Sequence, residues 1–175
     1  MALVQYTFLE SSMGMIAVIS RDDKIVGLDI RREDVYQAKK RLSAQYPDAI
    51  ESDKSFRTVR LLLNSYLKGE AVDFDVEIDI SDESPFTRRV LDELRRIPFG
   101  EVRSYGAIGK QLGYPMAARA VGQAVRRNPI PIIIPCHRVI REDGSLGGFS
   151  LGKEIKKGLL RLEGILDFVN ETAPL

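Results

Sequence analysis

The chain has 175 residues, of which 44% are hydrophobic and 29% are charged, and its formal net charge is +1. These values are ordinary for a soluble globular protein of one domain or two small ones. No apolar run reaches the length of a membrane span, and the N-terminus lacks the basic start and long apolar centre of a signal peptide. We therefore expect a soluble cytoplasmic protein with no membrane partner.

Cysteine and histidine occur once each, as the neighbours Cys136 and His137. A single cysteine excludes a disulfide within the chain, and the two residues are too few for a Cys/His zinc site, which needs four ligands. Carboxylate sites for Mg²⁺ or Ca²⁺ stay open, but no EF-hand or P-loop spacing is present. We expect neither a metal nor another cofactor.

Charge is spread unevenly along the chain. Residues 1–82 carry 11 basic and 15 acidic side chains, whereas residues 83–175 carry 15 basic and 10 acidic ones. Within 86–141 the count is 11 basic against 3 acidic, and such a stretch would attract a phosphate backbone. A solvated basic face without a partner gives the same pattern, so both interpretations stay open at this point.

The first 82 residues are predicted to form one α/β domain. Its expected elements are strands at 3–10, 15–20 and 24–30, a turn at 21–23, and helices at 32–47 and 55–69. Ser55 is the expected N-cap of the second helix. Residues 72–80 alternate strictly between apolar and acidic side chains, which predicts a half-buried strand with an acidic outer face. Because that face would repel DNA, we assign this domain a scaffolding role.

A second domain is predicted over residues 83–175. It begins with a helix at 85–97, for which Ser84 is the expected N-cap and Pro85 the first helical residue. Two shorter helices are expected at 104–113, with Ser104 as the N-cap, and at 115–128. They are joined by the turn LGYP, and this arrangement predicts a helix-turn-helix.

The second of these short helices combines small side chains with three arginines, Arg119, Arg126 and Arg127. Small residues let a helix backbone come close to another surface, and arginines contact phosphates or bases. Small residues suit close packing of helices inside a core equally well. The helix alone therefore does not decide for DNA binding.

The segment NPIPIIIPCHRVI, residues 128–140, brings Cys136 and His137 together after three prolines. The prolines exclude a helix and predict an extended path with a buried strand at 132–135. A nearby imidazole favours the thiolate, which is the nucleophilic form of cysteine. Adjacent side chains on a strand point to opposite faces, so a bend or a water would have to bring the pair together. A buried structural cysteine beside a structural histidine is the alternative.

The remaining elements are an Asp-Gly turn at 141–145, a glycine-rich loop at 146–152 and a closing helix at 153–164. Taken in order, the motifs AARAVGQAVRRNP, IPCHRVI, GGFSLG and LLRLEG resemble those of the O6-alkylguanine-DNA alkyltransferase family, the methylated-DNA–protein-cysteine methyltransferases. The likeness covers about 84–164, and SSMGMIAVIS resembles the family's N-terminal SPLG element. The resemblance implies an N-terminal RNase H-like α/β domain followed by a winged-helix-like (helix-turn-helix) DNA-binding alkyltransferase domain.

The resemblance also implies catalytic roles for four residues. Cys136 would accept the alkyl group, and His137 would act through a water as its base. Glu163 would orient His137, following the logic of a nucleophile–base–orienter triad. Asn128 would tie the helix-turn-helix to the active-site strand.

DNA or substrate contacts are implied for seven further residues: Tyr105, Arg119, Arg126, Arg127, Val139, Ser150 and Lys156. Among them, Arg119 would enter the duplex where the damaged base leaves, and Tyr105 would help to rotate that base outward. The backbone at Val139, with Ser150, would hold the guanine, while Lys156 would position the loop.

The implied activity is direct repair of DNA. The damaged nucleotide would be flipped out of the duplex, and its alkyl group would pass irreversibly from guanine O6 to Cys136, once per molecule. O4-alkylthymine stays open as a second substrate. The expected partner is double-stranded DNA containing O6-alkylguanine, approached through the minor groove by a monomer close to the nucleoid.

Two positions depart from the family's commonest pattern. Phe149 stands where tyrosine is usual, and Leu151 stands where glycine is frequent. We expect Leu151 to narrow the pocket, so that methyl adducts react well and free benzylated guanine reacts poorly.

The same residues are compatible with two other classes of function. A helix-turn-helix protein could bind DNA without chemistry, but the silent relatives of this family lack the cysteine, and Cys136 is present. A cysteine hydrolase could use Cys136, His137 and Glu163, but the basic helix pair would then have no purpose.

Overall fold

A computed structural model describes residues 2–169 of the chain. The chain divides into two compact units, one ending at Ile80 and the other beginning at Ser81. Among the residues that the structure describes, no helix is both long and apolar enough to cross a membrane.

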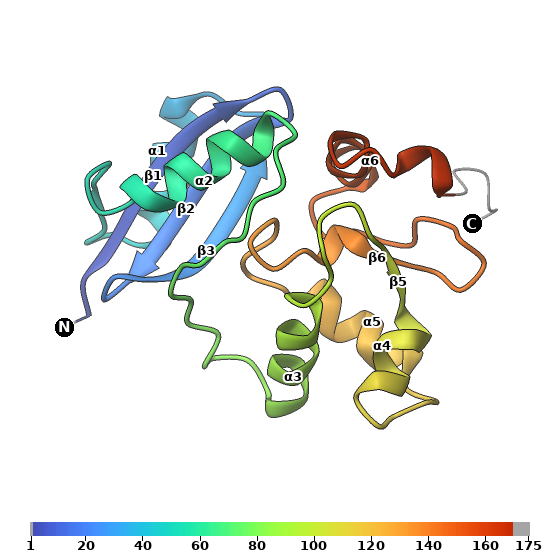
Figure 1. Ribbon diagram of the computed structural model, residues 1–175. Coiled ribbons are helices and arrows are strands. Elements are labelled where there is room, and N and C mark those ends of the chain that lie inside the picture. The colour runs from blue at the N-terminus through green and yellow to red at the C-terminus, as the bar shows by residue number, and fades with distance from the viewer. Residues whose placement is uncertain (1, 170–175) are drawn as a thin grey trace. The chain divides into compact units, whose positions relative to one another are not determined.

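The first unit is built on a four-stranded sheet (Figure 1). The strands are β1 (Val4–Ser11), β2 (Gly14–Arg21), β3 (Lys24–Arg31) and the short β4 (Ile50–Glu51), in the order β3-β2-β1-β4. All neighbours are antiparallel except β1 and β4. The predicted turn between β2 and β3 is confirmed: Asp22 and Asp23 both have positive φ, of 49° and 64°, as a two-residue hairpin turn requires.

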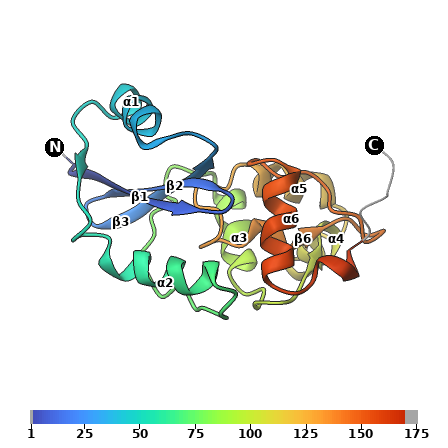
Figure 2. The same cartoon turned by 90° about the horizontal axis from the view of Figure 1, so that it is seen from above.

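Two helices, α1 (Val35–Gln45) and α2 (Arg57–Leu67), cover opposite faces of this sheet (Figure 2). On one face Leu42 of α1 packs with Tyr6, Ala17 and Ile19. On the other face Arg60 of α2 donates a hydrogen bond to Thr7 Oγ1 at 2.6 Å. The predicted α/β architecture is therefore confirmed.

Two local expectations for the first unit are wrong. Residues 72–80 form no strand, because their backbone meets β3 only at the isolated bridge between Ile25 and Ile78. Phe74 of this segment is buried, and Asp73, Asp75 and Glu77 are exposed. The alternation therefore reflects which side chains are buried, without hydrogen bonding to a neighbouring strand along the segment. The N-cap of α2 is Phe56 rather than Ser55, whose backbone N–H instead donates to Ser52 Oγ.

The second unit begins with three helices that pack on one another: α3 (Pro85–Leu94), α4 (Tyr105–Gln111) and α5 (Ala118–Arg126). The expected caps are confirmed, since Ser84 accepts from Thr87 N and Ser104 accepts from Ala107 N. A Cβ on Gly109 of α4 would lie 2.8 Å from the carbonyl oxygen of Tyr114, so glycine permits the tight approach of the connecting turn.

The helix-turn-helix is therefore confirmed, with one change of boundary. The second helix begins at Ala118 rather than at Pro115, because residues 114–117 form a turn in which Ala117 N donates to Tyr114 O at 3.0 Å. The expected helix was longer because proline is common at a first helical position.

The segment between α5 and Cys136 is buried as expected, but the predicted strand at 132–135 is wrong. Pro131 and Ile134 form one isolated bridge around a reversal in which Ile132 has φ 72°. Cys136 then opens a turn of 3-10 helix, η1 (Cys136–Arg138), and the chain continues into β6 (Val139–Ile140), which pairs in parallel with β5 (Arg103–Ser104). The prolines exclude a long helix, but they permit this single tight turn.

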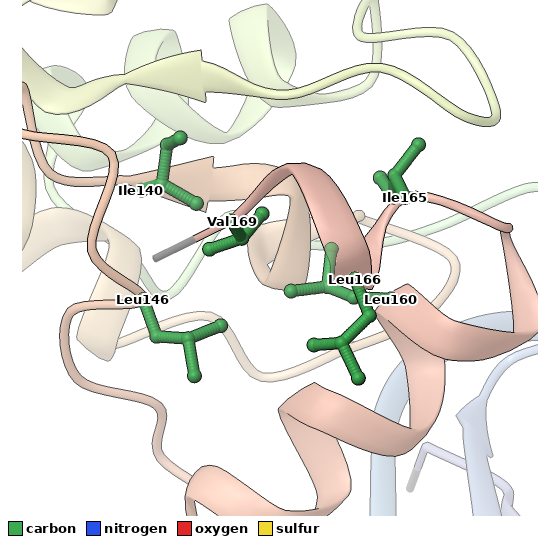
Figure 3. Close-up of a cluster of buried hydrophobic side chains, with 6 residues drawn as sticks. All are labelled: Ile140, Leu146, Leu160, Ile165, Leu166 and Val169. Carbon is green, nitrogen blue, oxygen red and sulfur yellow. The ribbon is translucent and has the colours of Figure 1, made fainter. Parts of the chain in front are cut away.

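The second unit closes with α6 (Lys153–Leu162) and the 3-10 turn η2 (Leu166–Phe168). Figure 3 shows six buried side chains that join this end of the chain to β6 and the glycine-rich loop: Ile140, Leu146, Leu160, Ile165, Leu166 and Val169. This cluster holds the C-terminal end of α6, where Glu163 lies, against the strand that follows η1.

Candidate active site

Cys136 is almost completely buried, with 1% of its surface exposed. Its backbone N–H donates to Ile134 O at 2.7 Å. Asn128 braces the same segment, because its Nδ2 donates to Ile134 O at 2.8 Å and its Oδ1 accepts from Ile130 N at 3.0 Å. The side chain of Asn128 thus connects the residues after α5 to the turn that presents the thiol.

His137 is fully buried and pairs with Glu163 through a contact of 2.6 Å between Nε2 and Oε1. The same carboxylate accepts from Gly100 N at 3.0 Å, and from Arg138 Nε and Nη2, each at 3.0 Å. His137 and Glu163, which lie 26 positions apart in the sequence, are therefore in direct contact, and three further donor groups from two residues share the carboxylate.

These contacts decide the charges of the pair. Burial by itself would raise the pKa of Glu163, but hydrogen bonds and charge from His137 and Arg138 outweigh it and lower the pKa to about 2. Burial lowers the pKa of His137 below its ordinary value, against the opposing effect of Glu163. Because an ionised carboxylate only accepts hydrogen bonds, the neutral imidazole carries its proton on Nε2 and has an acceptor lone pair on Nδ1.

The thiol itself is not activated at rest. Burial raises the pKa of Cys136 to about 11, although a hydrogen bond with Asn128 and the charge of Lys156 act in the opposite direction. The thiol of the protein without DNA is therefore protonated, so a base would have to take up its proton before the sulfur could act as a nucleophile.

Lys156 lies inside this unit with its side chain fully buried. Its Nζ donates to the carbonyl oxygens of Val139 and Leu146, each at 2.5 Å. Burial lowers the pKa of Lys156 to about 8. The ammonium group thus joins β6 to the start of the glycine-rich loop and occupies one side of the Val139 carbonyl, which was expected to contact guanine.

A small cavity of about 150 Å³ lies between α4, α5 and the glycine-rich loop. It is lined by Tyr105, Gly122, Gln123, Val125, Arg126, Gly148, Phe149 and Ser150. Pockets for drug-sized ligands are roughly 300–1,000 Å³, so this one suits a smaller group. Phe149 lines the cavity, whereas Leu151 is not among its lining residues.

Tyr105 is the first residue of α4 and lines this cavity. Burial raises the pKa of its phenol, and the neighbouring Cys136 adds to that effect. A Cβ on Gly147, whose φ is 68°, would lie 2.9 Å from the Tyr105 hydroxyl oxygen. Glycine at this position therefore lets the loop backbone lie directly against the phenol.

The arginines of α5 lie on its outer face. Arg119, Arg126 and Arg127 are exposed, as are the small residues Ala118 and Ala120, whereas Ala124 is buried. Arg127 is in addition paired with Glu83 at 3.0 Å. Some small residues of this helix are therefore exposed and open to a partner, whereas others pack in the core. Both interpretations of its small residues thus apply.

Two parts of the site were not anticipated from the sequence. The first is Arg138, which is buried and donates both to Glu163 and, through Nη1, to Ile97 O at 2.6 Å. The second is the cavity wall formed by Gly122 and Gln123. The Pro-Cys-His-Arg motif contains Arg138, but arginine is usually exposed, so the pattern gave no reason to place it beside Glu163.

The site defines a class of protein: one with a single buried cysteine next to a histidine that pairs with a carboxylate, carried by a helix-turn-helix unit. No group of three or more metal-ligating side chains was found within residues 2–169. The chain belongs to the 6-O-methylguanine DNA methyltransferase family. Residues 4–80 match the family's ribonuclease-like domain, and residues 85–165 match its DNA-binding domain.

Relatives and solved structures agree with this membership. The chain is 39% identical over 160 residues to the methylated-DNA–protein-cysteine methyltransferase of Methanosarcina acetivorans, covering 91% of this chain and 97% of that one. It is 38% identical to the protein of the same name from Mycolicibacterium paratuberculosis, covering 92% and 93%.

Two solved structures from Mycobacterium tuberculosis have a similar fold. The crystal structure of O6-methylguanine methyltransferase has a TM-score of 0.78 at 35% identity and covers 97% of each chain. A structure of that organism's protein in complex with DNA has a TM-score of 0.78 at 36% identity and covers 91% of this chain and 93% of the other. The predicted family and the predicted two-domain fold are both confirmed.

Proposed function

We propose that the protein repairs O6-alkylguanine in double-stranded DNA by transferring the alkyl group irreversibly to its own Cys136. The observation that carries this proposal is the position of the only cysteine, which is buried in the same 3-10 turn as His137, the partner of Glu163. The cavity that Tyr105 and Ser150 line lies in the same unit. Relatives named methylated-DNA–protein-cysteine methyltransferases support it. The protein acts as a monomer in the cytoplasm, where DNA is its partner.

DNA is approached through the minor groove by the outer face of α5. Ala118 and Ala120 are exposed there and add little bulk, so the helix can enter a narrow groove. Arg119 projects from the same exposed stretch and fills the space that the flipped nucleotide leaves. Arg126 and Arg127 neutralise phosphates on either side.

The flipped base enters the cavity between α5 and the glycine-rich loop. Ser150 and the loop backbone supply hydrogen bonds to its edge, and Lys156 fixes that loop through the carbonyl of Leu146. The alkylated oxygen then faces Cys136. O4-alkylthymine presents an alkyl group on a smaller ring in the same way and is a second, weaker substrate.

The reaction is an in-line displacement at the alkyl carbon. The thiol proton of Cys136 passes through a water to Nδ1 of His137, while Glu163 stabilises the imidazolium that forms. The sulfur attacks the alkyl carbon, the bond from that carbon to O6 breaks, and guanine takes the electron pair. The phenol of Tyr105, kept protonated by its raised pKa, donates a proton to the leaving base.

The product is a thioether, which water does not hydrolyse, so each molecule reacts once. Intact-protein mass spectrometry after mixing with a duplex containing O6-methylguanine tests this directly. We expect a stable increment of one methyl group on the peptide that contains Cys136, with none in Cys136→Ala. Repeated turnover without a retained increment would indicate a hydrolase, and binding without any increment would indicate a DNA-binding protein that performs no chemistry.

A further inference from the structure

Arg138 is a buried cation at the centre of the site. Only 6% of its surface is exposed. Its Nε and Nη2 donate to the two oxygens of Glu163, each at 3.0 Å, and its Nη1 donates to Ile97 O at 2.6 Å. The guanidinium therefore holds the same carboxylate that His137 contacts and attaches it to Ile97, just after α3.

Glu163 consequently lies between an imidazole and a guanidinium. A permanent cation on a buried carboxylate weakens the stabilisation that the carboxylate gives to a second cation. The other charged group that acts on His137 is the ammonium of Lys156, which opposes imidazolium formation as Arg138 does, while Glu163 favours it. The Cys136 thiol beside it is neutral until it gives up its proton.

We propose that Arg138 is a positioning residue which, acting through Glu163, keeps His137 neutral with its proton on Nε2. The importance of that state rests on the proposed function, because only a neutral imidazole can accept the thiol proton. If Glu163 faced His137 without Arg138, the carboxylate would favour the imidazolium more strongly against the opposing effect of burial, and more of the base would be occupied before the substrate arrived.

The geometry also explains why arginine occupies the position. The planar fork contacts both carboxylate oxygens and still reaches a backbone carbonyl, and it cannot lose its proton at any relevant pH. A lysine ammonium would keep the charge as a single point, without the paired contact that orients the carboxylate. Arg138→Lys keeps the positive charge but loses the paired contact, and Arg138→Met loses both. The two substitutions therefore separate the effect of the charge from the effect of the carboxylate's orientation.

The test uses the fact that His137 is the only histidine in the chain, so its imidazole resonances need no assignment. The ¹⁵N and ¹H shifts of the ring would be followed against pH in the wild-type protein, Arg138→Met, Arg138→Lys and Arg103→Met. Arg103 pairs with Glu93 in the same unit and serves as the matched control. The wild-type ring should be neutral at pH 7 with its proton on Nε2.

In Arg138→Met the imidazole should titrate about one pH unit higher, because the unscreened Glu163 then stabilises the charged ring. Arg138→Lys should show a smaller rise, and Arg103→Met none. Glu163→Gln should shift the titration downward, since the carboxylate that favours imidazolium is gone. Opposite shifts from the two partners of one ion pair would not follow from a general loss of packing.

Single-turnover methyl transfer supplies the second readout. The pH at which Arg138→Met reaches half of its maximal rate should move upward together with the titration of His137. A loss of stability with unchanged titration would mean that Arg138 is merely structural and would overturn the proposal. If Arg138→Met does not fold, the titrations of the wild-type protein and of Arg138→Lys still test the proposal. A charged imidazole in the wild-type protein at pH 7 would contradict it. Absence of methyl transfer in the wild-type protein, with the titrations as expected, would reject the proposed function alone.

Discussion

Glu163 at the C-terminal end of α6 lies 2.6 Å from His137 on η1, although 26 residues separate them in the chain. The contact depends on the buried cluster around Leu160 and Leu166 that holds α6 against β6 and the loop (Figure 3). Packing far from the thiol therefore determines whether base and carboxylate meet.

Glu163→Gln should destabilise the protein by about 3–5 kcal/mol, the usual effect of breaking a buried ion pair. The substitution leaves Arg138 buried without a countercharge and weakens the hydrogen bond to Gly100. Urea unfolding would measure the change. Glu154→Gln, at an exposed position of the same helix with only a distant partner in Lys157 at 3.9 Å, should change stability by less than about 0.5 kcal/mol. Equal losses in the two variants would contradict the account.

The contribution of Glu163 should depend on pH in a definite direction. Its pKa is about 2 in the folded protein and about 4.3 in an unfolded chain. Depression of a carboxyl pKa adds stability that is fully present above the unfolded value and lost as pH falls toward the folded one, here at most about 3 kcal/mol. The stability gap between wild type and Glu163→Gln should therefore narrow between pH 5 and pH 2, roughly. A gap that stays constant over this range would show that Glu163 is not ionised in the folded state.

The resting thiol should resist small electrophiles. Cys136 is 1% exposed and its pKa is raised to about 11, mainly by burial, so the native protein should react with iodoacetamide at pH 8 far more slowly than the urea-unfolded chain, by about 100-fold. The modification is read by intact mass, because the chain has one cysteine. Comparable rates in the two states would mean that the thiol is accessible or ionised at rest.

Tyr105→Phe should slow methyl transfer by about 100-fold, since removal of a general acid commonly has an effect of that order. The ring would still occupy the space beside Gly147 and the cavity, so DNA affinity should change little. Tyr114→Phe is the matched control, because the hydroxyl of Tyr114 contacts Arg89 at 3.0 Å rather than the site. Rapid-quench measurement of the transfer rate, with DNA binding measured separately, distinguishes lost chemistry from lost affinity.

Free O6-benzylguanine should inactivate the protein poorly compared with methylated duplex DNA. The cavity is small and Phe149 forms part of its wall, so a second aromatic ring has little room. Because Leu151 is not part of the wall, Leu151→Gly should leave the benzylguanine rate within about threefold of wild type, whereas Phe149→Ala should raise it. A large gain in the benzylguanine rate of Leu151→Gly would show that Leu151 limits the size of the pocket.

Features encoded by neighbouring residues could be predicted from the sequence. Ser84 and Ser104 were placed correctly as N-caps, and Asp22–Asp23 as a turn, because each depends on a few adjacent residues. The strand expected at 72–80 is absent, since a strand needs a partner along its length and alternation does not provide one. Contact between His137 and Glu163 was expected only through family resemblance.

The charge states of the site depend on the folded structure and could not be predicted from local pattern. Burial by residues that are distant in the sequence raises the pKa of the Cys136 thiol and keeps it protonated. Arg138 was missed for a related reason: nothing in its local sequence indicates that it becomes buried against a carboxylate 25 residues later.

The reversal at Ile132 has a consequence for the placement of Cys136. A branched side chain at φ 72° carries backbone strain of about 1–3 kcal/mol, while burial of the same isoleucine contributes about 1.5–3 kcal/mol. The backbone strain and the burial free energy of Ile132 nearly cancel, so this residue by itself does not favour the conformation that orients the Cys136 thiol. Glycine at this position would accept the angle but would remove the side chain that anchors it. The direction in which Cys136 points is therefore maintained by the surrounding core, and mutations that loosen that core should misplace the thiol before they unfold the protein.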